Sequence, residues 1–200
     1  MKKIDLDFYQ GNDVVEISRL LLGKYLVTRF DNAITGGVIV ETEAYAGATD
    51  KASHAYGGRR TARTEIMYAE GGVSYVYLCY GIHHLFNVVT NKKDIPHAVL
   101  IRAIEPIEGL DVMMLRRKKD KIDFTLTSGP GAMSEALGIK TKHTGIDMTG
   151  DQIWIEDKNY TIGAEDIIAG PRVGVAYAKE DALLPYRFSI KNNKWVSRAK

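Results

Sequence analysis

The sequence predicts an α+β fold, a single mixed domain on a curved, mainly antiparallel β-sheet with flanking helices. Strand-like segments outnumber helix-like ones and the two kinds rarely alternate, which argues against a doubly wound parallel sheet. No repeat, low-complexity stretch or obvious linker divides the 200 residues. We therefore expect one domain over residues 1–200.

The N-terminal part of the chain predicts one helix followed by two strands. Residues 12–23 start with a polar cap, carry apolar residues at helical spacing and end on a glycine. Residues 24–30 and 36–45 are predicted strands, and Asp31 with Asn32 between them supplies typical turn chemistry.

A polar, glycine-rich stretch follows and leads into a predicted hairpin. Residues 46–61 are too polar and irregular for a helix or strand, so we interpret them as a functional loop. A short helix is predicted to end near Gly71. Residues 74–80 and 84–90 are then apolar and aromatic runs on either side of a glycine-containing tip, which predicts a β-hairpin.

The rest of the chain continues this mixture of strands and helices. Basic residues at the end of the segment 109–119 suit the C-terminal dipole of a helix, and a Gly-Pro-Gly turn opens another helix at residue 129. The predicted elements are a strand at 97–104, helices at 109–119 and 129–137, strands at 152–156 and 172–176, and a last apolar anchor at 195–196.

Composition excludes several classes of protein. Lys and Arg number 27 against 25 Asp and Glu, so the net charge of +2 does not by itself indicate a nucleic-acid partner. Cys79 is the only cysteine, which excludes an intramolecular disulfide and favours a reducing compartment. The N-terminal residues lack the apolar core of a signal peptide, and no 18-residue apolar run follows. We expect a cytoplasmic protein with no membrane partner.

A carboxylate-rich segment ends the second predicted strand. Glu41, Glu43 and Tyr45 are two residues apart, so their side chains project from one face of a strand. Such a face should meet solvent or a ligand. The alternative is that these are simply solvated residues at a sheet edge.

Tyrosines mark the predicted hairpin. Tyr75, Tyr77 and Cys79 share one strand face, which either offers tyrosines to a pocket or packs into the core. Tyr80 stands against the glycine-containing tip, where little core can cover it.

The histidines do not predict a metal site. No two lie four residues apart on a helix, His83 and His84 point to opposite faces of a strand, and one cysteine cannot complete a thiolate site. The glycine-rich turn before residue 131 lacks the pattern of a P-loop, so a helix entry explains it better. We expect neither a metal nor another cofactor.

Taken together, these segments resemble one enzyme family over nearly the whole chain. Their order and spacing are similar to those of the alkyladenine (3-methyladenine) DNA glycosylase family. The matching pieces are ETEAY at 41–45, His54, GGR at 57–59, YVY at 75–77, YG at 80–81, Asn87, LIRAIEP at 100–106, SGP at 128–130, RVGV at 172–175, LPYRF at 184–188 and WVS at 195–197.

The resemblance implies a monofunctional base-excision repair enzyme that removes alkylated and deaminated purines from double-stranded DNA. Its substrates would include 3-methyladenine, 7-methylguanine, hypoxanthine and ethenoadenine. We expect a metal-free monomer, associated with the nucleoid if the source is bacterial.

The resemblance also implies which residues perform the chemistry. Glu43 would be the general base that activates water, and Arg102 and the backbone near Val175 would help to hold that water. Glu41 has the same orientation on the strand, but the resemblance assigns it no catalytic role.

Other matched positions would bind the DNA. Tyr45, His54 and Tyr77 would sandwich the flipped purine, and Asn87 would line the pocket against an exocyclic amino group. Tyr80 would enter the minor groove from a protruding hairpin that inserts into the DNA. Arg59 and Thr61 would contact the DNA backbone.

Two other function classes remain open on the residues alone. Stacked tyrosines also occur in modules that bind damaged bases or single strands without cutting them. A sugar hydrolase that uses Glu41 and Glu43 as its carboxylate pair is the third reading, although it leaves Tyr80 and the glycine-arginine loop unexplained.

Overall fold

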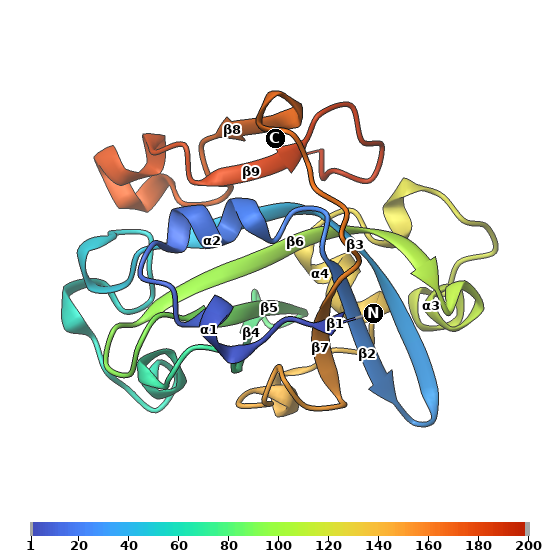
Figure 1. The fold of residues 1–200 in the computed structure, drawn as a ribbon, viewed down its shortest axis with the longest axis horizontal. Coiled ribbons are helices and arrows are strands. Elements are labelled where there is room, and N and C mark those ends of the chain that lie inside the picture. The colour runs from blue at the N-terminus through green and yellow to red at the C-terminus, as the bar shows by residue number, and fades with distance from the viewer. Residues whose placement is uncertain (1, 199–200) are drawn as a thin grey trace.

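Nine antiparallel strands form one sheet within residues 2–198, the part of the chain that the computed structural model describes (Figure 1). The order is β1-β7-β2-β3-β6-β5-β4, with β9 paired to β3 and β8 paired to β9. The strands are β1 (Lys2–Lys3), β2 (Tyr25–Phe30), β3 (Ala33–Tyr45), β4 (Ser74–Cys79), β5 (His83–Thr90), β6 (His97–Glu108), β7 (Ile153–Asp157), β8 (Ile167–Gly170) and β9 (Arg187–Ile190).

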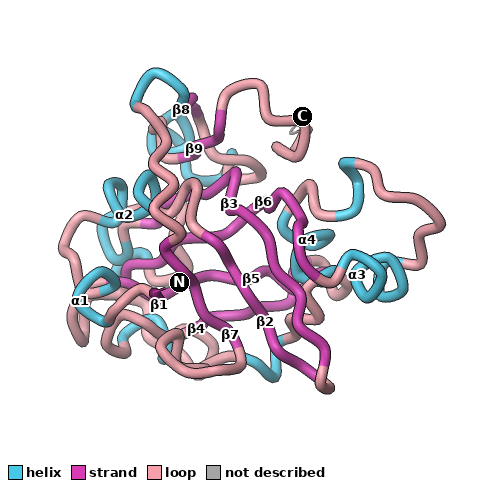
Figure 2. Tube along the Cα trace, turned by 45° about the vertical axis from the view of Figure 1, so that its right-hand side comes forward, coloured by secondary structure: helices cyan, strands magenta, loops and turns pink. Residues whose placement is uncertain are grey.

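The four α-helices of this described part lie around the sheet (Figure 2). They are α1 (Leu6–Tyr9), α2 (Val14–Leu20), α3 (Leu110–Arg117) and α4 (Pro130–Ala136). The polar cap predicted for the second of these is Asp13, whose carboxylate accepts the N–H of Val15 at 2.9 Å and that of Glu16 at 3.1 Å. One large antiparallel sheet with a few helices confirms the predicted α+β class.

Helix α2 covers the face of the sheet opposite to the one from which Glu41 and Glu43 of β3 project. Ser18 Oγ donates to Thr42 Oγ1 at 3.0 Å, which joins α2 to β3. Because side chains alternate along a strand, Thr42 and its neighbours Glu41 and Glu43 point to opposite faces. Helix α4 packs on β5 and β6, and α3 packs on α4.

A continuous apolar core lies between the sheet and these helices. The prediction that Trp195 is a last apolar anchor is confirmed, because its side chain is buried in this core. Other fully buried members are Leu26, Ile39, Phe86, Ile101, Ile104, Met113, Met133 and Phe188.

Strand β3 begins three residues before the predicted start. Asp31 and Asn32 have φ angles of 52° and 61°, and Phe30 pairs directly with Ala33. Positive φ at both central residues is the requirement of a two-residue type I′ hairpin turn. Only these two turn residues lie between β2 and β3.

The predicted strand at 172–176 is wrong. Residues 172–175 form an irregular loop after β8, residue 176 begins the 3₁₀ helix Ala176–Leu183, and the strands of this region are β8 and β9 instead. The physical reason is that Gly174 has a φ of 73° and that Arg172 and Val173 direct their polar groups at β3 rather than at a neighbouring strand. The short helix expected before Gly71 is a 3₁₀ turn, Glu65–Tyr68.

No helix among the described residues combines the length and the apolar character that spanning a membrane requires.

At Gly37 of β3 the backbone of β6 leaves no room for a side chain. A Cβ added there would overlap the carbonyl oxygen of Glu105 and lie 2.9 Å from Pro106 Cα. We therefore expect Gly37→Ala to lower the free energy of unfolding by about 1–3 kcal/mol, measured by urea denaturation. The control is Gly170→Ala, because nothing lies within 4 Å of a Cβ added there. Equal losses in the two variants would contradict this explanation.

Candidate active site

A cavity of about 600 Å³ opens at the end of the sheet where β3, β4, β5 and β6 meet the loop after β8. Tyrosines, two histidines and one buried carboxylate line it, which is a mixture typical of a ligand site rather than of a core. Its lining includes Glu43, Tyr45, His54, Arg63, Tyr75, Tyr77, Cys79, Tyr80, Asn87, Arg102, Val173, Gly174, Val175 and Tyr177.

Glu43 is fully buried and is held by three donors. Its Oε1 accepts the Val173 N–H at 2.8 Å and lies 3.2 Å from Arg102 Nη1. Its Oε2 accepts the Tyr45 hydroxyl at 2.8 Å. These two hydrogen bonds, together with the ion pair to the Arg102 guanidinium, offset the cost of removing a carboxylate from water.

The alternative that these carboxylates are solvated residues at a sheet edge is wrong. Strand β3 is flanked by β6 on one side and by β2 and then β9 on the other, so residues 41–43 lie in the interior of the sheet. The pairing of β3 with β6 shifts register next to Glu41 and leaves Arg102 without a partner residue on β3. Such a bulge redirects a side chain, and here the guanidinium reaches both carboxylates.

Glu41 binds Arg102 from the other side. Its Oε1 accepts Arg102 Nε at 2.9 Å, and its Oε2 accepts the backbone N–H of Ser197 at 2.7 Å. The Ser197 hydroxyl donates to Glu41 at 2.8 Å and accepts from Arg102 Nη2 at 3.2 Å. With every one of these bonds inside the protein, Glu41 fixes the guanidinium and closes the C-terminal segment over it.

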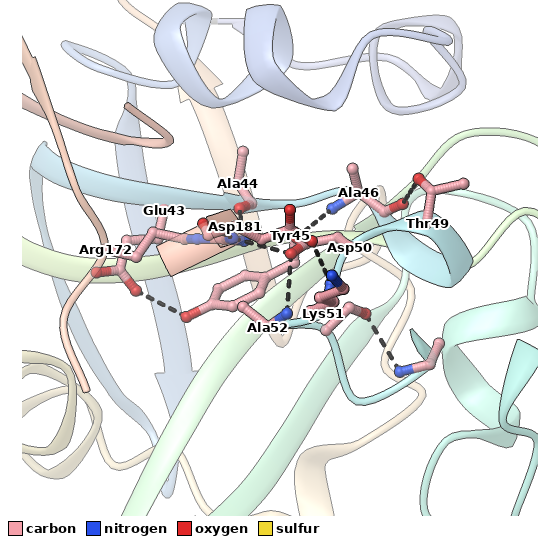
Figure 3. A network of polar contacts seen from close by, with 12 residues as sticks. Glu43, Ala44, Tyr45, Ala46, Thr49, Asp50, Lys51, Ala52, Arg172 and Asp181 are labelled. Carbon is pink, nitrogen blue, oxygen red and sulfur yellow. Dashed lines mark hydrogen bonds and ion pairs between the residues drawn. The ribbon is translucent and has the colours of Figure 1, made fainter. Parts of the chain in front are cut away.

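A second buried ion pair supports Tyr45 from behind (Figure 3). Arg172 makes two bonds to the Asp50 carboxylate, at 2.5 and 2.8 Å, and donates to the Ala44 carbonyl at 2.9 Å. Its guanidinium carbon lies 4.9 Å from the centre of the Tyr45 ring. Arg172 thus holds the ring of Tyr45 while the loop it begins brings Val173 to Glu43.

An aromatic wall faces this acidic floor. The rings of His54 and Tyr77 meet edge to face at 4.7 Å, and His54 Nδ1 shares a hydrogen bond of 2.8 Å with the Tyr75 hydroxyl. Burial, helped by Arg63 and Arg59, lowers the pKa of His54 to about 4. The imidazole is therefore neutral at pH 7. Burial also raises the pKa of Tyr45 and of Tyr77, so both remain phenols.

Asn87 and Val175 complete the inner lining. The Asn87 amide donates to the carbonyls of Tyr75 and Leu85, at 3.1 and 3.3 Å, so its position is rigid. Val175 is buried against Ala52 and Ala178. The backbone N–H that contacts Glu43 belongs to Val173, in the same loop as Val175.

The hairpin tip lies at the mouth of the cavity. The tip is the three-residue turn Tyr80, Gly81 and Ile82, since Cys79 pairs with His83, so Tyr80 is not the last strand residue. Its φ is 51° and its side chain is 88% exposed. A bulky residue in this strained conformation, presented to solvent, is typical of a contact surface.

The two residues expected to bind the DNA backbone lie in the loop beside the cavity but are not part of its lining. Arg59 and Thr61 are both exposed. The Arg59 carbonyl accepts Thr64 Oγ1 at 3.0 Å, which fixes the loop while leaving the guanidinium in solvent.

Sequence reasoning missed four residues of this site. Asp50 and Arg172 support it, Val173 contributes its N–H, and Tyr177 covers one side, with its hydroxyl donating to the Ala52 carbonyl at 3.0 Å. The one available signal was the RVGV match itself, which was interpreted locally as a strand.

The described residues contain no group of three or more His, Cys, Asp or Glu side chains that could hold a metal ion. His97 instead shares a 3.0 Å hydrogen bond with Asn91, and His84 accepts the Thr141 N–H at 3.2 Å.

Comparison with known proteins finds one family over almost the whole chain. A family model described as methylpurine-DNA glycosylase (MPG) matches residues 7–194. A protein of Chlamydia abortus named "Putative 3-methyladenine DNA glycosylase" is 46% identical over 188 residues, covering 92% of this chain and 97% of the relative. Proteins of the same name from Bacillus cytotoxicus and Clostridium novyi are 44% and 42% identical, covering 96% and 99% of this chain and 97% and 100% of their own lengths.

The buried pair behind Tyr45 makes the site sensitive to Asp50. Asp50→Ala leaves the Arg172 guanidinium buried without its counter-ion, so we expect the free energy of unfolding to fall by about 3–5 kcal/mol. Glu180→Ala breaks an exposed ion pair with Lys51 in the same region and should change stability little. Urea denaturation compares the two, and a small loss in Asp50→Ala would contradict the role of the pair.

The lowered pKa of His54 predicts a pH dependence of stability. Between pH 6.5 and about 4 the unfolded chain binds a proton at this histidine that the folded chain does not, so acidification favours unfolding. The stability that neutral His54 contributes is complete above pH 6.5 and is lost as pH falls toward 4. His54→Gln should therefore lose stability less steeply over this range than the unmodified protein, by urea denaturation, whereas His83→Gln, which alters an exposed histidine, should follow it. An NMR titration of His54 with a midpoint near pH 6.5 would refute this.

Proposed function

The chain belongs to the methylpurine-DNA glycosylase family, and from that premise we propose which bases its cavity binds and how it removes them. The protein is a DNA glycosylase, a hydrolase that acts on N-glycosyl bonds. Our proposal is that it extrudes alkylated or deaminated purines from duplex DNA and cleaves their glycosidic bond with a water activated by Glu43. The observation that carries it is a buried carboxylate, bonded to Arg102, on the floor of an aromatic cavity.

Extrusion is required because a stacked base hides its glycosidic bond. Flipping a nucleotide costs a few kcal/mol, and least for damaged or weakly paired bases. Tyr80 would enter the minor groove and occupy the gap that the nucleotide leaves. Its 88% exposure and its place between cavity and solvent support this role.

The aromatic lining suits a purine with a positive charge. Alkylation at N3 or N7 makes a purine cationic, and a cation against an aromatic face gains roughly 0.5–2 kcal/mol over a neutral base. Tyr45, Tyr77 and His54 would sandwich the base. The neutral state of His54 supports this, because an imidazolium would repel the cation.

Asn87 would limit which bases enter. Its amide nitrogen donates to two backbone carbonyls, which opposes a movement of the side chain to make room for a bulkier base. An exocyclic amino group, such as that of guanine, would meet this rigid group. Hypoxanthine and ethenoadenine would avoid it, as would 3-methyladenine, while 7-methylguanine would depend on its cationic character.

Hydrolysis would proceed with a single carboxylate. As the purine leaves with the electrons of the glycosidic bond, the sugar becomes oxocarbenium-like, and ionised Glu43 stabilises that charge. Glu43 then takes a proton from the water whose oxygen bonds to the anomeric carbon. A cationic purine departs without help, whereas a neutral one must be protonated as it leaves. Arg102 and the backbone at residues 173–175 would position the water.

The same proposal covers the whole molecule. Residues 1–200 would form one catalytic domain that works as a monomer without a cofactor, on a curved sheet whose β4–β5 hairpin inserts into DNA. The partner is double-stranded DNA, with Arg59 and Thr61 contacting its backbone. A cytoplasmic, nucleoid-associated location would follow if the source is bacterial.

An excision assay tests this proposal. Duplexes with hypoxanthine or ethenoadenine and methylated DNA are incubated with the protein and heated in alkali, which breaks the strand at abasic sites. We expect strand breaks with the unmodified protein and a loss of about 10²–10⁴-fold in Glu43→Gln, since a positioned base contributes that much. Glu43→Gln should still bind the lesion duplex.

The matched control is Glu16→Gln, which alters an exposed glutamate on α2, the helix on the other face of the sheet. It should excise normally. Absence of abasic sites with every substrate would overturn the proposed function and favour a damage-binding module. Full activity in Glu43→Gln would overturn the role of that residue alone.

A further inference from the structure

A second cleft lies on the other side of the hairpin tip. Its volume is about 800 Å³, and it shares only His83 and Gly131 with the active-site cavity. The hairpin therefore stands between two hollows. Lining residues that matter here are Arg29, Ile82, Arg116, Lys140, Lys142 and His143.

Three contacts hold the segment that carries the two lysines. His84 Nδ1, on β5, accepts the Thr141 N–H at 3.2 Å. His143 Nδ1 accepts the Lys140 N–H at 3.0 Å, and its ring stacks on Phe30 at 4.2 Å with an interplanar angle of 11°. The lysines are thus attached to a backbone that is fixed both to the hairpin and to the end of β2.

The cleft is positively charged. Arg29, Lys140 and Lys142 are exposed, and none of them takes part in the ion pairs found between described residues. Arg116 donates to neutral partners, at 3.2 Å to Thr35 and at 3.1 Å to the Ala136 carbonyl.

Two carboxylates also line the cleft, Asp31 and Glu135. Glu135 is already paired with Arg117, which leaves Asp31 against four cationic side chains. Four cations against one carboxylate, next to an exposed hairpin tip, are the electrostatic pattern of a polyanion contact.

We propose that this cleft binds the phosphate backbone of the DNA strand opposite the lesion. The proposal rests on the proposed function and adds the second strand to it. The minor groove is only about 6 Å wide, so a side chain inserted into it lies close to both backbones. The active-site cavity takes the extruded nucleotide on one side of Tyr80, and the cleft then faces the other strand.

The chemistry of the cleft suits phosphate. Lys140 and Lys142 present point charges, and Arg116 Nη1 already donates to Thr35 and Ala136. Contacts of this kind position the duplex without regard to sequence. They would keep the partner strand in place while its lesion-bearing neighbour is pulled away.

The test is a binding experiment with strand-specific neutralisation. The probe is a duplex whose hypoxanthine nucleotide carries a 2′-fluorine, which slows cleavage so that binding can be measured. Methylphosphonates, which lack the phosphate charge, replace phosphates near the lesion in one strand or the other. The variant is Lys140→Ala with Lys142→Ala, and the control is Lys92→Ala with Lys93→Ala, two exposed lysines beyond the far end of β5.

The double variant at 140 and 142 should bind the duplex without methylphosphonates roughly ten- to a hundredfold more weakly at 0.1 M salt. In a plot of log K against log salt concentration, the magnitude of its slope should be smaller by about 2. Methylphosphonates in the opposite strand should weaken the unmodified protein more than this variant, which keeps only Arg29 and Arg116 in the cleft. Those in the lesion strand should weaken both equally. The control variant should behave as the unmodified protein does in each case.

Two outcomes would overturn the inference. Affinity and salt slope unchanged by the double substitution would show that the cleft does not bind DNA. If the double variant instead lost its sensitivity to methylphosphonates in the lesion strand, the cleft would be assigned to that strand. Failure of the proposed function is separately visible, because excision from an unfluorinated hypoxanthine duplex is measured in parallel and would then be absent in the unmodified protein.

Discussion

The structure depends on two carboxylates buried side by side on one strand. Glu41 and Glu43 both lie inside the sheet with no exposed surface, and the Arg102 guanidinium contacts both. Two buried negative charges repel each other and are poorly solvated, so they require a cation and further donors at fixed positions. The bulge in β6, the C-terminal segment at Ser197 and the loop at Val173 each provide one of these.

The same constraint separates the two glutamates chemically. Glu41 uses both oxygens on Arg102 and on Ser197, all within the protein, so it serves as a positioning residue. Glu43 is buried as well but is part of the cavity lining, whereas Glu41 is not. Two carboxylates that look equivalent on a strand thus differ because one of them is enclosed by the C-terminal segment.

The β4–β5 hairpin organises the outer surface in a comparable way. Its tip stands between an aromatic, acidic-floored cavity and a basic cleft, and Tyr80 is held outward by a left-handed backbone. We propose the first hollow as the site of the extruded purine and the second as a site for backbone phosphates, so the hairpin would lie between two DNA contacts of different chemistry.

The sequence by itself determined the family and several local features of the structure. The cap at Asp13, the Asp31–Asn32 turn and the aromatic strands of the hairpin were predictable because short-range hydrogen bonds and side-chain alternation set them. Tertiary structure alone decided that residues 172–176 form a loop, that Glu41 and Glu43 lie in the sheet interior, and that Asp50 supports Tyr45. Those outcomes depend on partners more than 100 residues apart, which no local pattern records.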